Sequence, residues 1–400
     1  MSCRICQAPT QEILDLGSSP PANELKKSPD EVQQAYPLVL EWCQTCDNVQ
    51  LRDTLTAEEL YRDYLYVTPR SSMLDAHYEY LVSYLLGNGY AREDSFVVEV
   101  GSNAGHFLEY IRPRVGRVLG VDPATQIAEM ANEAGIPTVS DFFSRDRASL
   151  IAAEHGRSQL VVARHCLAHN ESPHEMVDAA ASLLSDDGYF VIENAYVLNT
   201  IENSEFDQIY HEHMFYFSIR SMRVLLELHG MRLVDVMMTL VHGGSIVFVA
   251  TRNTEAEVTE AVGRYASREE QFLNREAFDT LARRADEIRD RLANLITDLG
   301  RQGRTIFSYG ATAKGNTLLN FVGITSSDIP YCVDNTPLKQ GLFLPQSNIE
   351  VISEETAASD PPDYYLLTAW NYQDEIITKV RRAGNFATKF IVPIPFVRIV

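Results

Sequence analysis

The stretch from 205 to 218 holds the densest polar chemistry in the chain. Tyr210, His211, Glu212 and His213 are consecutive and are flanked by four aromatic residues. Aromatic rings can exclude water, and a dry surrounding strengthens electrostatic interactions and shifts pKa values. A histidine beside a carboxylate is a common way of holding a general base near neutrality. The pattern predicts an acid–base site. Two alternatives remain open: a metal site at His211 and His213, whose i, i+2 spacing suits a strand, and incidental residues at a helix start.

A glycine turn between 95 and 111 is the second candidate site. An apolar run ends near Glu99, and Gly101 and Gly105 precede an apolar-periodic helix. Glycine lets the backbone adopt unusual φ values and approach a ligand closely, beside the free N–H groups of a helix N-terminus. The next predicted strand ends in Asp122, about 20 residues further on, where nucleotide-binding α/β folds place the acid that accepts ribose hydroxyls. The alternative is a plain strand-turn-helix without a ligand.

The cofactor expected at this turn is S-adenosylmethionine (SAM). The dinucleotide signature G-x-G-x-x-G is absent, whereas an acid ahead of the glycines is typical of SAM-dependent methyltransferases. Ligands of such sheets lie beyond the carboxyl ends of the strands. The loop after the predicted strand 160–163 is therefore a further part of the expected SAM site. The residues expected to bind SAM are Glu99, Gly101, Ser102, Asn103, Gly105, Asp122 and Arg164.

A second glycine turn lies between 305 and 316. Its helix starts near Lys314, and a positive charge at a helix N-terminus favours a phosphate group. The aromatic and amide groups that follow the strand 364–368 could stack on a nucleotide base and read it. The glycine pair between 241 and 245 permits close backbone approach to a ligand. The residues expected to bind substrate are His242, Ser245, Tyr309, Lys314, Trp370 and Asn371.

Four cysteines form two C-x-x-C pairs near the N-terminus, Cys3 with Cys6 and Cys43 with Cys46. Two such pairs can each supply two thiolates to a tetrahedral Zn²⁺ ion. The long interval between the pairs closes at little extra entropic cost. No fifth cysteine lies nearby, so the pattern predicts a closed structural zinc site. A redox role of the C-x-x-C pairs is the alternative.

Composition narrows the classes of partner. The 400 residues include 34 basic and 55 acidic ones, which gives a formal net charge of −21. Affinity for nucleic acid rests on neutralising many phosphates, so nucleic acid is not expected as a partner. No run of about 18 apolar residues occurs, and we expect no membrane association. The N-terminus lacks the apolar core of a signal peptide, which predicts a cytoplasmic protein. We expect a monomer or a weak dimer.

Hydrophobic patterning predicts three parts. Residues 1–69 form a zinc-binding module and a linker, and residues 70–252 alternate helices with short apolar strands, as a doubly wound sheet requires. Residues 253–400 begin with an amphipathic connector helix and continue as a second nucleotide-type fold. The predicted fold class is α/β, with a small N-terminal zinc module, a central doubly wound class I SAM methyltransferase domain and a C-terminal Rossmann-like domain. The strands predicted for the central domain are 97–100, 118–121, 160–163 and 189–193, with a hairpin of 231–238 and 245–251.

Taken together, the motifs resemble a known enzyme family. The four-cysteine module, E-V-G-S-N-A-G, Y-H-E-H, H-G-G-S, Y-G-A-T-A-K-G and A-W-N, in this order, resemble the sugar C-methyltransferases of deoxysugar biosynthesis. This group includes the 3-C-methyltransferases that act on dTDP-4-keto-deoxysugars. The resemblance covers nearly the whole chain. It implies SAM-dependent transfer of a methyl group to the carbon beside the ketone of a nucleotide-linked sugar.

The resemblance also implies roles in the Y-H-E-H stretch. His213 resembles the general base, and Glu212 and Tyr210 resemble residues that orient the base or stabilise the enolate. A proton next to a ketone is acidic enough for a positioned imidazole if the enolate oxygen is stabilised. The implied reaction needs no metal ion at the reacting centre.

Further implied site residues lie elsewhere in the chain. His169 resembles another active-site histidine, and Tyr64 or Tyr66 resembles a tyrosine that faces the substrate. In the family, the C-terminal fold binds the nucleotide of the sugar. The resemblance therefore implies that Lys314, Trp370 and Asn371 contact the nucleotide.

Two positions depart from the family pattern, and two other functions stay open. Ala104 stands where the family has the carboxylate of S-N-D-G, which removes a polar contact to the cofactor. The segment 345–348, Pro-Gln-Ser-Asn, stands where the family tends to have a Pro-Gly turn, which bears on the C-terminal pocket. One alternative function is SAM-dependent methylation of another carbonyl or hydroxyl acceptor of natural-product synthesis. The other is a zinc-bearing binding module that uses the nucleotide-type folds only as a scaffold.

Overall fold

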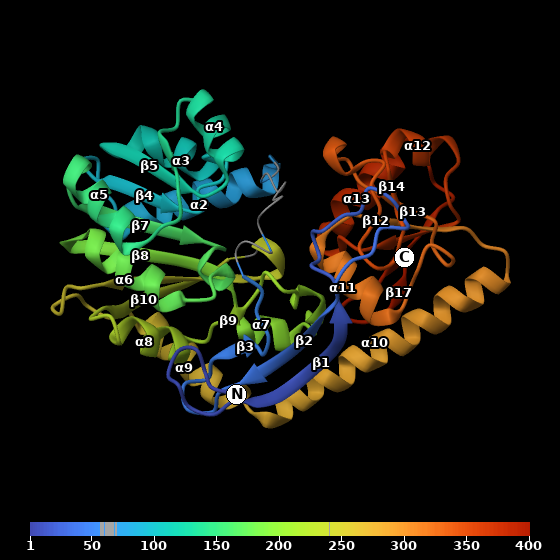
Figure 1. The fold of residues 1–400 in the computed structure, drawn as a ribbon, viewed down its shortest axis with the longest axis horizontal. Coiled ribbons are helices and arrows are strands. Elements are labelled where there is room, and N and C mark those ends of the chain that lie inside the picture. The colour runs from blue at the N-terminus through green and yellow to red at the C-terminus, as the bar shows by residue number, and fades with distance from the viewer. Residues whose placement is uncertain (57–59, 61–67, 69, 240) are drawn as a thin grey trace.

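The computed structural model describes the whole chain except residues 57–59, 61–67, 69 and 240, and the side chain of His242. Figure 1 shows two α/β bodies side by side, with the N-terminal strands below them and one long helix running from these strands along the C-terminal body. Each body contains its own sheet, and the N-terminal strands belong to a third. The predicted α/β architecture is confirmed.

The central sheet positions the cofactor turn. In the described part of the chain it has seven strands in the order β10-β11-β8-β7-β4-β5-β6, and β11 runs antiparallel to both of its neighbours. All five residues of β4 are buried, because a valine-rich strand in the middle of a parallel sheet is covered on both faces. The predicted strands and the late hairpin are therefore confirmed. The strands are β4 (Phe96–Val100), β5 (Arg117–Asp122), β6 (Thr138–Ser140), β7 (Ser158–Arg164), β8 (Leu184–Ala195), β10 (Arg232–Thr239) and β11 (Ser245–Thr251).

Helices cover both faces of this sheet, as a doubly wound fold requires. One face is sealed by α2, whose buried leucines join the valines of the sheet in one apolar cluster. The opposite face carries α6 and α8. The helices of this domain are α2 (Ser72–Gly87), α3 (His106–Ile111), α4 (Thr125–Glu133), α5 (Arg145–His155), α6 (Pro173–Leu183), α7 (Val197–Glu202) and α8 (Ile219–Glu227).

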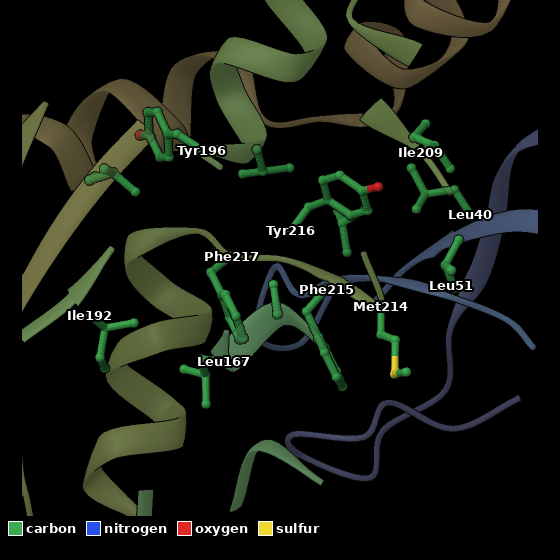
Figure 2. Packing of buried hydrophobic residues seen from close by; sticks show 14 of the residues in the cluster. Leu40, Leu51, Leu167, Ile192, Tyr196, Ile209, Met214, Phe215, Tyr216 and Phe217 are labelled. Carbon is green, nitrogen blue, oxygen red and sulfur yellow. The ribbon is translucent and has the colours of Figure 1, made fainter. Parts of the chain in front are cut away.

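The N-terminal module shares its sheet with the central domain. Its strands β1 (Gln11–Ser19), β2 (Tyr36–Trp42) and β3 (Val49–Leu51) are extended by β9 (Phe215–Tyr216), which follows the Y-H-E-H stretch directly. Figure 2 shows Leu40 and Leu51 of the module near Met214 and Tyr216 in one buried cluster. The module thus has a hydrophobic core in common with its neighbour, in addition to its cysteines.

The connector is two helices, α9 (Glu260–Phe272) and α10 (Arg275–Arg301), where the sequence predicted a single one. Asn274 separates them, because its side chain accepts a hydrogen bond from the backbone N–H of Ala277 and caps α10. The predicted apolar stripe of α10 is buried along its length. It packs within the chain, where the ring centre of Phe278 lies 5.1 Å from that of Trp42.

The C-terminal body is a second parallel sheet with one antiparallel edge strand, which confirms the Rossmann-like prediction. Its six strands, counted over the described residues, have the order β14-β13-β12-β15-β16-β17. No described helix of the chain is both long and apolar enough to cross a membrane. The elements are β12 (Ile306–Tyr309), α11 (Ala313–Val322), β13 (Tyr331–Val333), β14 (Glu350–Ile352), α12 (Glu354–Ser359), β15 (Tyr364–Leu367), α13 (Gln373–Arg382), β16 (Lys389–Val392) and β17 (Arg398–Ile399).

The departure at 345–348 keeps a glycine-like backbone. Gln346 has φ of 61° and Asn348 has φ of 58°, a conformation that glycine adopts most readily. The backbone N–H of Gln346 donates to Oε1 of Gln33 at 3.3 Å, and Lys26 and Phe343 exchange backbone hydrogen bonds of 2.8 Å. The replaced Pro-Gly turn therefore lies against the N-terminal module and retains its left-handed backbone.

Candidate active site

The four N-terminal cysteines converge as predicted. Their sulfur atoms all lie within 4.8 Å of one another. Cys3 Sγ is 3.6 Å from Cys46 Sγ, and Cys6 Sγ is 3.5 Å from Cys43 Sγ. A tetrahedral zinc ion with Zn–S bonds of about 2.3 Å would hold its sulfurs roughly 3.8 Å apart. The donor set and its spacing therefore fit a structural Zn²⁺ ion, which would close the base of the β1–β2–β3 sheet.

The turn between β4 and α3 has the shape that its glycines predicted. Gly101 and Gly105 have φ of 64° and 78°. A Cβ atom at Gly105 would lie 2.9 Å from Ile136 Cγ2, so the position also lacks room for a side chain. At the end of β5, Oδ2 of Asp122 accepts from the backbone N–H of Asn103 at 2.8 Å. Oδ1 accepts from the N–H of Ala124 at 3.0 Å. These bonds fix the carboxylate at the rim of the turn, where it keeps lone pairs for ribose hydroxyls.

Glu99 and Arg164 form a buried ion pair under this turn. Arg164 Nη2 lies 2.8 Å from Glu99 Oε1, with 13% and 0% of the two side chains exposed. Burial raises the pKa of Glu99 to about 7 and Arg164 opposes the rise. The guanidinium also lies over the rings of Tyr78 and Phe107, at 4.8 and 4.9 Å from their centres. Arg164 thus holds the Glu99 carboxylate in place through the ion pair. Its predicted contact with SAM stays a prediction.

Two polar atoms at the turn are available to a ligand. Within the described structure, Oε2 of Glu99 and Oγ of Ser102 are buried and have no hydrogen-bond partner. Buried polar groups are nearly always paired, so unpaired ones at a glycine turn fit the polar edges of a nucleoside. The residues present therefore suit SAM, although Ala104 adds no side-chain polar group.

His213 is held as a neutral base. Its Nδ1–H donates to the carbonyl oxygen of Gln208 at 2.8 Å, which leaves a lone pair on Nε2. Nε2 accepts from the hydroxyl of Tyr210 at 2.7 Å. Burial, and then the neighbouring His169, lower the pKa of His213 well below its usual value. The ring of His169 lies 4.9 Å from that of His213, so the structure brings both predicted histidines and Tyr210 together.

The other two residues of the motif face the protein interior. His211 is 1% exposed and meets the ring of Tyr36 edge-on at 6.0 Å. Glu212 is 2% exposed, and burial raises its pKa. Since His211 and His213 have different neighbours, the geometry does not favour a metal ion shared between them. The segment is also an irregular loop, so the helix-start alternative is wrong.

This loop is fixed from three sides. The backbone N–H of Met214 donates to the carbonyl of Ala168 at 2.9 Å, in the segment that carries His169. Its own carbonyl accepts from the N–H of Leu51 in the zinc module at 3.0 Å. Figure 2 shows Ile209 on one side of the loop and Phe215 and Phe217 on the other within the buried cluster. The Y-H-E-H stretch is therefore held at its end by backbone hydrogen bonds to two other segments.

The C-terminal body presents Lys314 and Trp370 to the same region. Trp370 Nε1–H donates to Oδ2 of Asp207 at 2.6 Å, and the ammonium of Lys314 lies 5.1 Å from the centre of the Trp370 ring. Burial raises the pKa of Asp207, and the charge of Lys314 opposes this rise. The same charge lowers the pKa of His213. Lys314 thus lies over the ring that bonds to Asp207, and its predicted contact with a phosphate group stays a prediction. Sequence reasoning missed Asp207, although it lies in the stretch singled out first.

A cavity of about 430 Å³ lies between the two α/β bodies, and of these residues Trp370 forms part of its wall. Trp370 and Asn371 line it from one side, and Gly243 and Gly244 from the other. A Cβ atom at Gly243 would lie 2.6 Å from Oε2 of Glu205, and one at Gly244 would collide with the amide of Asn199. The glycine pair is thus required by neighbouring side chains at the cavity wall.

The remaining predicted substrate residues have mixed placements. Tyr309 is buried and its hydroxyl donates to Glu354 Oε1 at 2.7 Å. Ser245 is buried and its hydroxyl donates to the carbonyl of Val241 at 3.1 Å. Their contact with substrate stays a prediction. Tyr64 and Tyr66 lie outside the described residues, as does the side chain of His242.

Three family models match the chain. A model described as a methyltransferase domain matches residues 74–236, and one for a C-methyltransferase C-terminal domain matches 240–395. A zinc binding domain model matches 3–61. C-methyltransferase NovU of Streptomyces niveus is 36% identical over 404 residues, which span 100% of this chain and 96% of that protein.

Solved structures are similar to less than half of this chain. Magnesium protoporphyrin IX methyltransferase from Synechocystis with bound SAM is 15% identical, with a TM-score of 0.35, over 45% of this chain and 80% of that one. N-methyltransferase NodS from Bradyrhizobium japonicum is 13% identical, with a TM-score of 0.36, over 46% and 98% of the two chains.

Proposed function

This chain belongs to the C-methyltransferase family that carries an N-terminal zinc-binding module, and on that premise we propose its acceptor: a nucleotide-linked 4-keto-deoxysugar, methylated at the carbon beside the ketone. The chain is a SAM-dependent C-methyltransferase, so its interpretation as a non-catalytic binding module is wrong. We expect dTDP as the nucleotide. The second candidate is another carbonyl or hydroxyl acceptor of natural-product synthesis, which would need no nucleotide cavity.

The cofactor supplies an electrophilic methyl group on a sulfonium ion. Gly101 and Gly105 would let the backbone approach it, and Asp122 would accept its ribose hydroxyls. Ser102 and Glu99 would offer their unpaired oxygens to its polar edges. The four thiolates Cys3, Cys6, Cys43 and Cys46 would hold Zn²⁺ away from the reacting carbon and serve the fold alone.

The observation that carries the proposal is the pairing of the Tyr210 hydroxyl with Nε2 of His213 at 2.7 Å. His213 is neutral at pH 7 because its pKa is lowered, so Nε2 can accept a proton. The proton of the carbon beside the ketone would end on Nε2, directly or by way of the Tyr210 hydroxyl that donates to it. The carbonyl oxygen gains charge as the proton leaves, and the ammonium of Lys314 would stabilise that charge. The enolate carbon would then take the methyl group as the methyl–sulfur bond breaks, which leaves the sulfonium as a neutral thioether.

The cavity supports a nucleotide at the other end of the substrate. Trp370 offers an aromatic face and Asn371 an amide, and both lie on the C-terminal side. A volume of about 430 Å³ falls within the range of ligand pockets. Trp370 also bonds to Asp207, six residues before His213 in the chain, and we propose that one substrate reaches from the cavity past this contact to the base.

The test uses a dTDP-4-keto-deoxysugar with two measurements. Mass spectrometry after incubation with SAM should detect a product heavier by one methylene with wild type and not with His213→Ala. Proton exchange at the acceptor carbon, followed by NMR in D₂O without SAM, should likewise need His213. His155→Ala, a substitution on the remote helix α5, is the matched control and should behave as wild type.

Each other outcome has a definite meaning. If His213→Ala still exchanges the proton, another group is the base. If wild type binds SAM and yields no product, the acceptor belongs to the second candidate class.

A further inference from the structure

One segment between the cysteine pairs has no role so far in the zinc site or in the reaction. Its sequence is Leu14-Asp-Leu-Gly-Ser-Ser-Pro-Pro-Ala-Asn23. It leaves β1 at Ser19 and crosses toward the region between the two α/β bodies. Two prolines hold it in an extended turn, and the N–H of Glu24 closes that turn on the carbonyl of Pro21 at 3.1 Å. Its last two residues make contacts that connect all three parts of the chain.

Asn23 reaches the acid of the Y-H-E-H stretch. Its Nδ2–H donates to Oε1 of Glu212 at 2.9 Å, across 189 residues of sequence. Glu212 is buried, and throughout the described residues its other carboxylate oxygen has no hydrogen-bond partner. Asn23 is thus the side chain that fixes the orientation of this carboxylate. Both its side chain and its backbone lower the pKa of Glu212 against the rise that burial causes.

The preceding residue is held by the C-terminal body. The carbonyl of Ala22 accepts from Nδ2 of Asn316 at 2.6 Å, and Asn316 lies on α11 two positions after Lys314. Ala22 and Asn316 are both buried. Consecutive residues of one loop therefore bind the acid–base loop on one side and the helix that carries Lys314 on the other.

We propose that Asn23, supplied by the zinc module, is a positioning residue of the active site. It orients Glu212 and, through Ala22, ties the acid–base loop to the C-terminal body. This gives the zinc module a role in the reaction: the ion closes the base of the sheet whose β1 strand delivers the loop. The effect on turnover rests on the proposed function, whereas the contact itself can be tested without an acceptor.

The acceptor-free test measures hydrogen exchange of the peptide 205–214 by mass spectrometry. Asn23→Ala should increase deuterium uptake in this peptide and leave the affinity for SAM and the bound zinc unchanged. Glu24→Gln, at the neighbouring exposed residue, should change nothing. Unchanged uptake in Asn23→Ala would overturn the proposal, whatever the acceptor is.

The turnover test is a double-mutant cycle on the methylation of the dTDP-4-keto-deoxysugar. Asn23→Ala should lower kcat about tenfold, the loss expected for a hydrogen bond to a charged group, with KM for SAM unchanged. In a Glu212→Gln background, Asn23→Ala should lower kcat only slightly, because the carboxylate that Asn23 orients is already replaced. The ionisation of Glu212 in the pH profile of kcat should move to higher pH in Asn23→Ala.

Additive effects in this cycle would overturn the proposal, since they would mean that Asn23 acts through the fold alone. Asn23→Leu, which keeps a similar side-chain size and loses the donor without adding a charge beside Glu212, covers the case in which alanine disturbs the loop. If wild type does not methylate the sugar, the proposed acceptor fails, and the exchange measurement still decides the role of Asn23.

Discussion

Replacing Gly105 by alanine should damage the cofactor turn in two separable ways. The backbone at Gly105 has φ of 78°, and a left-handed conformation costs an L-residue about 1–2 kcal/mol. The new Cβ would also lie 2.9, 3.0 and 3.2 Å from three side-chain atoms of Ile136. Overpacking of a buried side chain costs about 1–3 kcal/mol more. The expected loss of stability is therefore about 2–5 kcal/mol.

Gly89 provides a matched control. Its φ is 74°, and a Cβ there would meet nothing within 4 Å. Gly89→Ala should thus lose only the backbone term of about 1–2 kcal/mol. Urea denaturation compares the free energies of unfolding of the two variants, and isothermal titration measures their affinity for SAM. Gly105→Ala should bind SAM at least about tenfold more weakly, because the turn must move away from its place beside the cofactor to relieve the clash. A tenfold loss of affinity corresponds to about 1.4 kcal/mol of binding free energy. Gly89→Ala should keep the affinity of wild type.

The steric argument is refuted if the two variants lose the same stability. The assignment of the turn to the cofactor is refuted if Gly105→Ala binds SAM as wild type does. The two results are independent, because one depends on packing against Ile136 and the other on the position of the turn.

Three further predictions concern the metal, the base and the domain contact. Cys43→Ser should reduce the bound zinc, measured by plasma mass spectrometry, to well below one ion per chain and lower the thermal midpoint, because three thiolates no longer complete the tetrahedron. His213 has a lowered pKa, so the unfolded chain binds a proton that the folded chain does not. The free energy of unfolding should therefore fall as pH drops below about 6.5, by up to about 1.4 kcal/mol per pH unit. That slope, from denaturation at several pH values, should be smaller in His213→Asn, and equal slopes would contradict the burial of a neutral ring. Trp370→Phe keeps the aromatic face and removes the donor to Asp207 that holds the ring in place, so KM for the nucleotide sugar should rise about tenfold while the Kd of SAM stays constant. An unchanged KM would mean that the bond to Asp207 does not position the ring for the substrate.

Several features could be predicted from the sequence because they rest on short-range chemistry. The glycine turn at Gly101 and Gly105 follows from φ values that few other residues adopt. Two C-x-x-C pairs suffice for four convergent thiolates once their strands pair. The stripe on α10 is periodic, and periodicity identifies a buried face wherever the helix lies. In each case the information is contained within a few consecutive residues.

Other features depend on contacts between distant segments. Strand β9 has two residues, too few for any pattern, and it becomes a strand only because β3 supplies its partner. Lys314 has the local signature of a phosphate site, and only the packing of the C-terminal body places its ammonium 5.1 Å from the centre of the Trp370 ring.

The bond from Asn23 to Glu212 joins residues 189 positions apart, and that from Trp370 to Asp207 joins residues 163 apart. Asparagine and tryptophan side chains carry no local mark of such partners. The sequence by itself therefore determined the turns, the metal ligands and the apolar faces. Only the tertiary structure decided which polar groups meet at the acid–base loop, because a hydrogen bond forms between groups that folding brings within about 3 Å, irrespective of their distance along the chain.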